Sequence, residues 1–181
     1  MLKRLYLPRS WIHPALRGGK SAIHGEGAIA AKPFRIGEKL MEFGGEPITR
    51  AGIDSELYRP RSIWAVAEGI WLALPKSDPR ASLDENLNHC CDANAWLADE
   101  VTLVARRAIA AGEEITLDQG TWNFDEDDYL WDCERCRCRA RTCRGRLTAS
   151  DWKLPVLQAR YRGHFHPLIL QRMEERTRRV S

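Results

Sequence analysis

The sequence predicts a mainly β protein that ends in a short helical tail. Over roughly the first two thirds of the chain, short apolar segments alternate with turns that contain glycine, a pattern typical of short β-strands. A chain of 181 residues, of which 44% are apolar, is long enough to bury one hydrophobic core without disulfide bonds. After residue 150 the pattern changes, and two prolines stand where helices can begin. We therefore expect one compact β domain followed by helices.

The first strands are predicted at residues 28–31 and 39–43. Both segments are apolar, and glycines that favour turns flank them at residues 25, 27, 37, 44 and 45. The first dozen residues are basic and aromatic, so we expect them to lie along an edge of the domain. Residues 50–61 are polar and contain a proline, which indicates a loop or a short helix.

Four more strands are predicted at residues 63–67, 70–74, 101–105 and 114–118. In the tail, Pro155 suits an early position of a helix over residues 151–161. A second helix is expected from Pro167 to about Arg178, with leucines and a methionine on its apolar side.

The charge balance does not indicate a nucleic-acid binder. The chain carries 28 basic and 25 acidic residues, a net charge of +3, and this is too mild to attract a polyanion on charge alone. Its start lacks the apolar core of a secretory signal, and no apolar run approaches the roughly 20 residues of a membrane span. We expect a cytoplasmic protein whose cysteines are reduced and available for a metal.

The cysteines are clustered in a way that indicates a zinc site. All six lie between Cys90 and Cys143, and the spacing Cys133-x2-Cys136-x-Cys138-x4-Cys143 lets one loop wrap a Zn²⁺ ion. From the spacing alone, this loop supplies either all four ligands or three of them, with Cys90 or Cys91 as the fourth. Six arginines between residues 135 and 146 lie close to the cysteines in the sequence, where positive charge would lower the pKa of a thiol.

Five sequence segments, taken in order, resemble the SET-domain protein-lysine methyltransferases that carry a post-SET zinc motif. Residues 21–27 (SAIHGEG) resemble the family's cofactor loop, and residues 42–46 (EFGGE) resemble its E-Y-x-G-E strand. Residues 88–94 (NHCCDAN) look like N-H-S-C-x-P-N, and residues 110–120 (AAGEEITLDQG) look like A-G-E-E-L-T-x-D-Y-G. Residues 136–145 match the post-SET motif that ends in C-R-G.

The resemblance implies a fold of small sheets in which the N-H and E-E-L-T segments form a pseudoknot, an exception to the rule that chains avoid threading. It implies a lead-in at residues 1–19, a SET domain at 20–120, an acidic loop with the post-SET motif at 121–147, and a helical tail at 148–181. The implied ligands are S-adenosylmethionine and zinc. The cofactor residues would be Gly25, Glu26, Gly27, Asn88, His89 and Leu147, and the zinc ligands Cys91, Cys136, Cys138 and Cys143, with Cys133 as a rival fourth ligand.

The implied activity is transfer of methyl groups to a lysine of a protein or peptide, with no membrane or nucleic acid as a partner. The positions that line the family's lysine channel are Phe43, Leu117 and Gln119. Phe43 and Gln119 stand where the family has tyrosines. Tyr58 or Tyr129 could replace them only from elsewhere in the fold. The alternative is a SET-fold binding module that keeps the zinc and cofactor sites but has lost turnover.

An acidic stretch between residues 125 and 132 separates the last predicted strand from the zinc loop. It could attract a basic substrate peptide. A solvated loop, screened at physiological salt, is the interpretation we favour.

Overall fold

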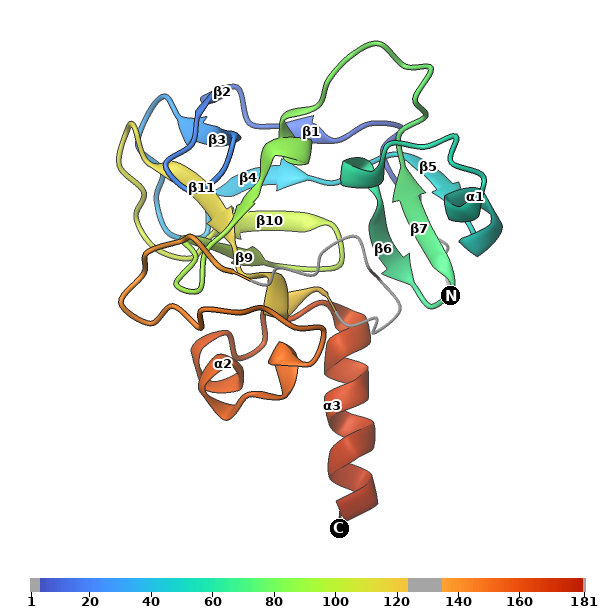
Figure 1. Cartoon of the computed structure of the whole chain (residues 1–181), viewed down its shortest axis with the longest axis vertical. Coiled ribbons are helices and arrows are strands. Elements are labelled where there is room, and N and C mark those ends of the chain that lie inside the picture. The colour runs from blue at the N-terminus through green and yellow to red at the C-terminus, as the bar shows by residue number, and fades with distance from the viewer. Residues whose placement is uncertain (1–3, 124–134, 181) are drawn as a thin grey trace.

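The computed structural model describes residues 4–123 and 135–180, and it shows three small β-sheets with few helices (Figure 1). The acidic stretch, Cys133 and Tyr129 lie outside the described residues. The first sheet has the antiparallel strand order β1 (Trp11–Ile12), β4 (Lys39–Glu42), β10 (Thr102–Ala105), β9 (Ala95–Leu97). Its edge strand β1 confirms that part of the first dozen residues lies at an edge.

The second sheet carries most of the site. Its order is β2 (Leu16–Lys20), β3 (Glu26–Ala30), β11 (Glu114–Leu117), β8 (Asn88–His89). Strand β8 runs parallel to β11, with Asn88 opposite Thr116 and His89 opposite Leu117, whereas the other pairs are antiparallel. The expected pseudoknot brings these same two segments together.

The third sheet is an antiparallel set with the order β5 (Glu46–Ile48), β7 (Ile70–Ala73), β6 (Trp64–Ala67). Each strand predicted from the apolar pattern is present within one to two residues. The sequence analysis did not predict β1, β2, β5, β8 or β9, which have only two to five residues each. Elements of that length leave little periodicity to detect.

One hydrophobic core lies between the sheets. It is built from alternating positions of the strands, such as Leu40, Leu72 and Leu103, each of which is fully buried. The main cavity described below borders this core, because Phe43, Trp64 and Leu117 also belong to it. The site therefore rests on a packed scaffold.

The α-helices of the described residues are α1 (Arg50–Asp54), α2 (Pro155–Arg160) and α3 (Pro167–Val180), and short 3-10 turns occur elsewhere in the chain. The expected continuous helix over 151–161 is wrong. A 3-10 turn at Asp151–Lys153 ends at Leu154, and Pro155 begins a new helix. The reason is local, since a residue that precedes proline is forced out of the helical region, and Leu154 is extended, with ψ at 122°.

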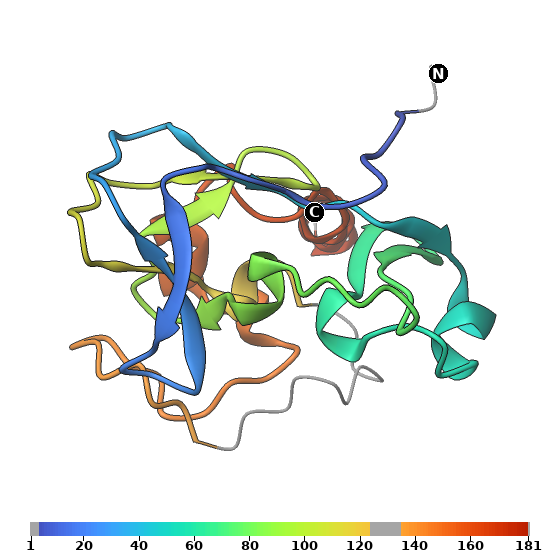
Figure 2. The same cartoon turned by 90° about the horizontal axis from the view of Figure 1, so that it is seen from above.

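The helical tail packs on the β domain through a second core of Trp152, Leu157, Tyr161, Phe165 and Ile169. His166 secures the start of α3, because its backbone N–H donates to the Thr121 carbonyl and its Nε2 lies 3.0 Å from the Ala65 carbonyl of β6. Seen end-on in Figure 2, α3 lies beside the third sheet. Among the described residues, no helix has the length and apolar content needed to cross a membrane.

Candidate cofactor and metal site

A cavity of about 780 Å³ opens between the second and third sheets and the zinc loop. A volume of this size suits a cofactor or a comparably large ligand. Seven of the residues singled out from the sequence line it: Phe43, Asn88, His89, Leu117, Gln119, Cys136 and Leu147. The cofactor-loop residues Ile23 and His24 also line it, next to the predicted Gly25. The fold thus brings three of the six predicted cofactor positions and all three lysine-channel positions to one space, whereas Gly25, Glu26 and Gly27 do not line it.

Asn88 fastens the glycine loop to the second sheet. Its side-chain amide lies within hydrogen-bond distance of the His24 carbonyl (3.1 Å) and the Glu26 carbonyl (2.9 Å). It also lies 2.7 Å from Oε1 of Glu114. Asn88 is buried, so these bonds are shielded from water. The asparagine of the N-H pair therefore shapes the loop that borders the cavity.

Glu114, which the sequence analysis did not single out, supports the glycine loop from β11. Both of its carboxylate oxygens accept from the hydroxyl of Ser21, at 2.9 and 2.8 Å, and that hydroxyl accepts in turn from the backbone N–H groups of Ile23 and His24. A Cβ added to Gly27 would lie 2.3 Å from Oε1 of Glu114. Gly27 thus has a packing reason to be glycine, and Gly25 has a conformational one, with φ at +53°.

The lysine-channel positions form an aromatic wall with a polar end. Phe43 stacks on Trp64, with ring centroids 3.8 Å apart, and Trp122 lies against the same indole at 4.8 Å. Gln119 follows β11 in a 3-10 turn, in which the side chain of Asp118 accepts from the backbone N–H of Gly120. Tyr58 does not line this cavity, because its hydroxyl donates to Glu46 on the third sheet.

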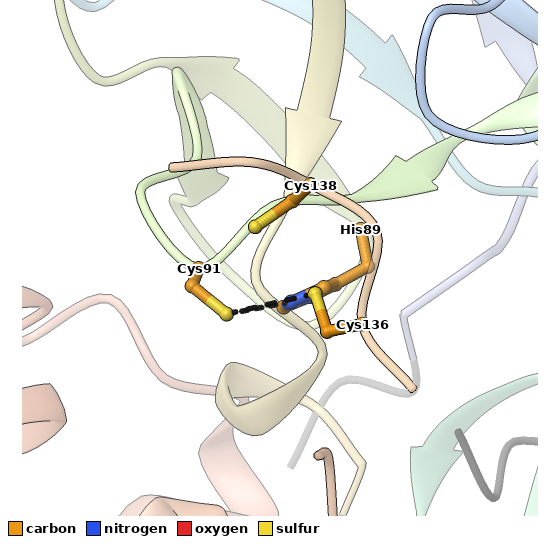
Figure 3. Close-up of side chains that lie close together, drawn as sticks. All are labelled: His89, Cys91, Cys136 and Cys138. Atoms are coloured by element: carbon orange, nitrogen blue, oxygen red, sulfur yellow. Dashed lines mark hydrogen bonds between the residues drawn. The ribbon is translucent and has the colours of Figure 1, made fainter. Parts of the chain in front are cut away.

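Three of the four predicted zinc ligands lie close together, as Figure 3 shows, and one of them, Cys136, also lines the cavity. The ligand atoms of His89, Cys91, Cys136 and Cys138 all lie within 4.8 Å of one another, and the Cys91 and Cys136 sulfurs are 3.9 Å apart. Two thiolates bound to one zinc ion at ~2.3 Å lie roughly 3.8 Å apart in a tetrahedron. The donor set therefore fits Zn²⁺.

Cys143, the fourth predicted ligand, lies beside this group, and its thiol interacts with those of Cys136 and Cys138. His89 is the additional residue in the cluster. Its Nδ1 accepts from the Gln119 backbone N–H at 3.0 Å, which leaves the proton of a neutral ring on Nε2, 3.2 Å from the Cys91 sulfur. The geometry thus makes His89 a hydrogen-bond donor to the Cys91 sulfur.

The thiols of the cluster have shifted pKa values. Burial raises the pKa of Cys136 to about 12 and also raises that of Cys91. Cys138 differs, because burial, which would raise its pKa, is outweighed by hydrogen bonds from the backbone N–H groups of Cys91 and Ala140, and its pKa falls to about 7. A bound cation would stabilise the thiolate form of all of them.

Arg144 joins the zinc loop to the second sheet. Its backbone N–H donates to the Cys91 sulfur at 3.3 Å, and its guanidinium makes two bonds to Asp118, at 2.7 and 2.8 Å. A third bond, of 2.8 Å, reaches Asp151 at the start of the tail. The side chain of Arg144 therefore connects the zinc loop to both the second sheet and the tail.

The cavity also fits S-adenosylmethionine as a ligand. Its lining is polar at Asn88 and His89 and apolar at Phe43, Leu117 and Leu147, so both the charged and the aromatic parts of a nucleoside derivative find suitable surroundings. Leu147 is buried and follows directly on the zinc loop, so an ion bound there would fix this wall.

Comparison with known proteins agrees with this arrangement. The family model described as SET domain matches residues 25–120, which is more than half of the chain. The histone-lysine N-methyltransferase trithorax of Drosophila melanogaster is 29% identical over 135 residues, which cover 66% of this chain and 4% of that protein. The probable histone-lysine N-methyltransferase set-23 of Caenorhabditis briggsae is 27% identical over 146 residues, which cover 70% of this chain and 57% of that protein.

Among solved structures, an active polycomb repressive complex 2 in the basal state matches with 26% identity and a TM-score of 0.47, over 59% of this chain and 15% of that one. The chain spans a small part of the trithorax protein and little more than half of set-23.

Proposed function

Since the chain belongs to the SET-domain family, we propose that it transfers methyl groups from S-adenosylmethionine to a lysine of a protein, with histones as the first substrates to test. The observation that carries this proposal is the shared cavity. Predicted cofactor positions (Asn88, His89, Leu147) and lysine-channel positions (Phe43, Gln119) line the same space, which lets a donor and an acceptor meet.

The reaction needs a neutral amine. A lysine ammonium has no lone pair, and its free pKa is about 10.4. Bound S-adenosylmethionine supplies an electrophilic methyl group on a sulfonium. The chain supplies an apolar wall, because Phe43 and Trp64 are buried and stacked, and a low-dielectric wall disfavours the charged amine.

Gln119 stands at the polar end of this wall. Its buried side chain offers an amide oxygen that can accept from a substrate amine, the role that a tyrosine hydroxyl has in relatives of the family. Its backbone N–H donates to His89, so its position depends on β8 as well as on β11. Positioning of this kind supplies much of the rate in a transfer that needs in-line contact at roughly 3–3.5 Å.

The test is methyl transfer by the purified chain with methyl-labelled S-adenosylmethionine and a panel of basic proteins that includes histones. We expect label on lysine, and loss of label when the target lysine is replaced by arginine. The matched control is Asn88→Ala, which removes the clamp on the glycine loop and should abolish transfer. Cofactor binding without label on any protein of the panel would contradict the proposal.

The second candidate is a binding module that keeps the fold but no turnover. The stacked ring of Phe43 and the amide of Gln119 favour it, because neither supplies a phenolic hydroxyl. The double variant Phe43→Tyr with Gln119→Tyr places tyrosines at both positions and distinguishes the enzyme from the binding module. A gain of activity from an inactive protein identifies a degenerate enzyme, and a loss of existing activity identifies an adapted pocket.

A further inference from the structure

Asp84 places a carboxylate in the wall of the main cavity that the proposed reaction leaves without a role. It belongs to the 3-10 turn Leu83–Asn86, just before β8, and it is only partly buried. Its Oδ2 accepts from the Ser10 hydroxyl at 2.7 Å, and its Oδ1 accepts from the Ser82 hydroxyl. A carboxylate has about four acceptor sites, so these two bonds leave Asp84 able to accept from a ligand.

The charge of this carboxylate has no counter-ion among the described residues. Glu85, the neighbouring acid of the cavity wall, is neutralised by Arg59, whose Nη1 lies 2.8 Å from its Oε1. Asp84 makes no ion pair of this kind, and burial raises its pKa although the hydrogen bonds from Ser82 and Ser10 lower it. Burial of a charge without a partner is unfavourable. A carboxylate of this kind in a cavity favours a cationic ligand.

The arginines of the cavity wall do not supply the missing charge. Arg61, Arg135 and Arg137 line the cavity, but they are exposed to solvent and none of them forms an ion pair with Asp84. A cation in contact with Asp84 therefore has to come with a bound molecule.

The position of Asp84 is tied to the lysine-channel segment. The Ser10 hydroxyl that donates to Asp84 also accepts from the backbone N–H of Gly44, at 3.0 Å. Asp84 is thus two hydrogen bonds from Gly44, the residue that follows Phe43. The packing here is close, because a Cβ added to Gly44 would lie 2.5 Å from the backbone oxygen of Arg9. The carboxylate is therefore held at the end of the cavity where Phe43 lies.

We propose that Asp84 binds the target lysine in its charged form and so selects a cationic side chain for the channel. The inference rests on the proposed function, because it assigns the residue that recognises the substrate amine. A lysine with a pKa of about 10.4 is neutral in roughly one molecule in 2,500 at pH 7. An entirely apolar wall favours only this small fraction. Asp84 attracts the abundant ammonium, and the rings of Phe43 and Trp64 favour the later loss of its proton to water.

The experiment compares two synthetic peptide libraries on the full chain loaded with S-adenosylhomocysteine. Both libraries are random except at the central position, which is lysine in one and norleucine, an uncharged analogue, in the other. A fluorescent label measures the peptide retained, so the readout needs binding and no turnover. We expect the wild type to retain at least about threefold more of the lysine library, a conservative value for a hydrogen bond between charged groups. In Asp84→Asn the two libraries should be retained equally.

The norleucine library guards against a folding defect, because a distorted cavity in Asp84→Asn would lower the retention of both libraries alike. Glu68→Gln is the matched control. Glu68 is an exposed acid on the β6–β7 hairpin and does not line the main cavity, so its replacement should leave the ratio between the libraries at the wild-type value.

The inference is overturned if the wild type does not prefer the lysine library, if it retains neither library, or if Asp84→Asn keeps the wild-type ratio. It is also overturned if Asp84→Asn weakens binding of S-adenosylmethionine but not of S-adenosylhomocysteine, because the cation at Asp84 would then be the sulfonium. Methyl transfer to whole proteins decides the proposed function independently.

Discussion

The guanidinium of Arg144 donates two parallel hydrogen bonds to the carboxylate of Asp118, at 2.7 and 2.8 Å, and the carboxylate is fully buried. This forked geometry is the strongest form of an Arg–carboxylate pair. It ties the zinc loop to the end of β11, next to Gln119. The loop is therefore held over the cavity by an ion pair as well as by the thiols.

Removal of the Arg144 side chain is expected to destabilise the fold strongly. Arg144→Ala leaves the Asp118 charge buried without a partner, which costs about 3–5 kcal/mol in free energy of unfolding. Arg144→Lys should recover only part of this, because an ammonium cannot make the fork. Urea denaturation measures the free energy of unfolding of both variants. Arg141→Ala, an exposed change in the same loop, is the control and should stay within about 0.5 kcal/mol of the wild type.

The pairing itself is isolated by a double-mutant cycle. Asp118→Asn keeps the cap on the Gly120 N–H but removes the charge. The double variant Arg144→Ala with Asp118→Asn should cost at least about 1 kcal/mol less than the sum of the single changes. Simple additivity would show that Arg144 acts through its other contacts.

The chain is expected to bind one zinc ion through sulfur ligands, with His89 as a supporting donor. Because Nδ1 of His89 accepts from Gln119, its Nε2–H faces the Cys91 sulfur and is not free to coordinate. His89→Ala should therefore weaken metal binding by about 10–100-fold, the effect of losing an outer-shell partner, without changing the ligand set. The absorption bands of the protein loaded with cobalt(II) report which residues bind the metal.

The matched variant is Cys143→Ser, which should shift the cobalt bands because a thiolate is lost. The opposite pattern, a shift in His89→Ala and none in Cys143→Ser, would place His89 in the coordination sphere and Cys143 outside it. Removal of the metal by a chelator should weaken cofactor binding by at least about tenfold, since Leu147 follows the zinc loop into the cavity wall.

Glu114 is expected to control cofactor affinity although it does not line the cavity. It holds Ser21 and Asn88, which in turn hold the glycine loop. Glu114→Ala should weaken binding of S-adenosylhomocysteine about tenfold, or about 1.4 kcal/mol, in isothermal titration. The control is Glu113→Gln, whose side chain pairs with Arg107 at the surface. Equal affinity in the two variants would refute this role.

The sequence predicted which residues share the main cavity better than it predicted the elements that support them. Motif residues such as Asn88 and Gln119 come from segments with fixed order, and the structure brings them together as that order implied. Glu114 was overlooked because its role depends on a register, with β11 opposite β3, that no single segment encodes. The two-residue strand β8 and the break at Leu154 are likewise set by tertiary pairing and by one local proline effect.

His166 is expected to make the attachment of the tail sensitive to acid. It is 1% exposed, its Nε2 lies 3.0 Å from the Ala65 carbonyl, and its Nδ1 accepts from the Leu168 N–H. Burial lowers its pKa to about 4, and among the described residues only the Ala65 carbonyl opposes that shift. In the unfolded chain its pKa is about 6.5. The unfolded state therefore binds more protons between these values, and stability rises with pH across that window.

The contribution of a neutral His166 is complete above pH 6.5 and is lost as the pH falls toward 4, by about 3 kcal/mol in all. His166→Gln keeps a side-chain donor for Ala65 but cannot titrate. The difference in unfolding free energy between wild type and variant should change by up to about 1.4 kcal/mol per pH unit from pH 6 to pH 4.5. If the difference in unfolding free energy between the wild type and His166→Gln did not change with pH, the folded chain would accommodate the imidazolium form of His166.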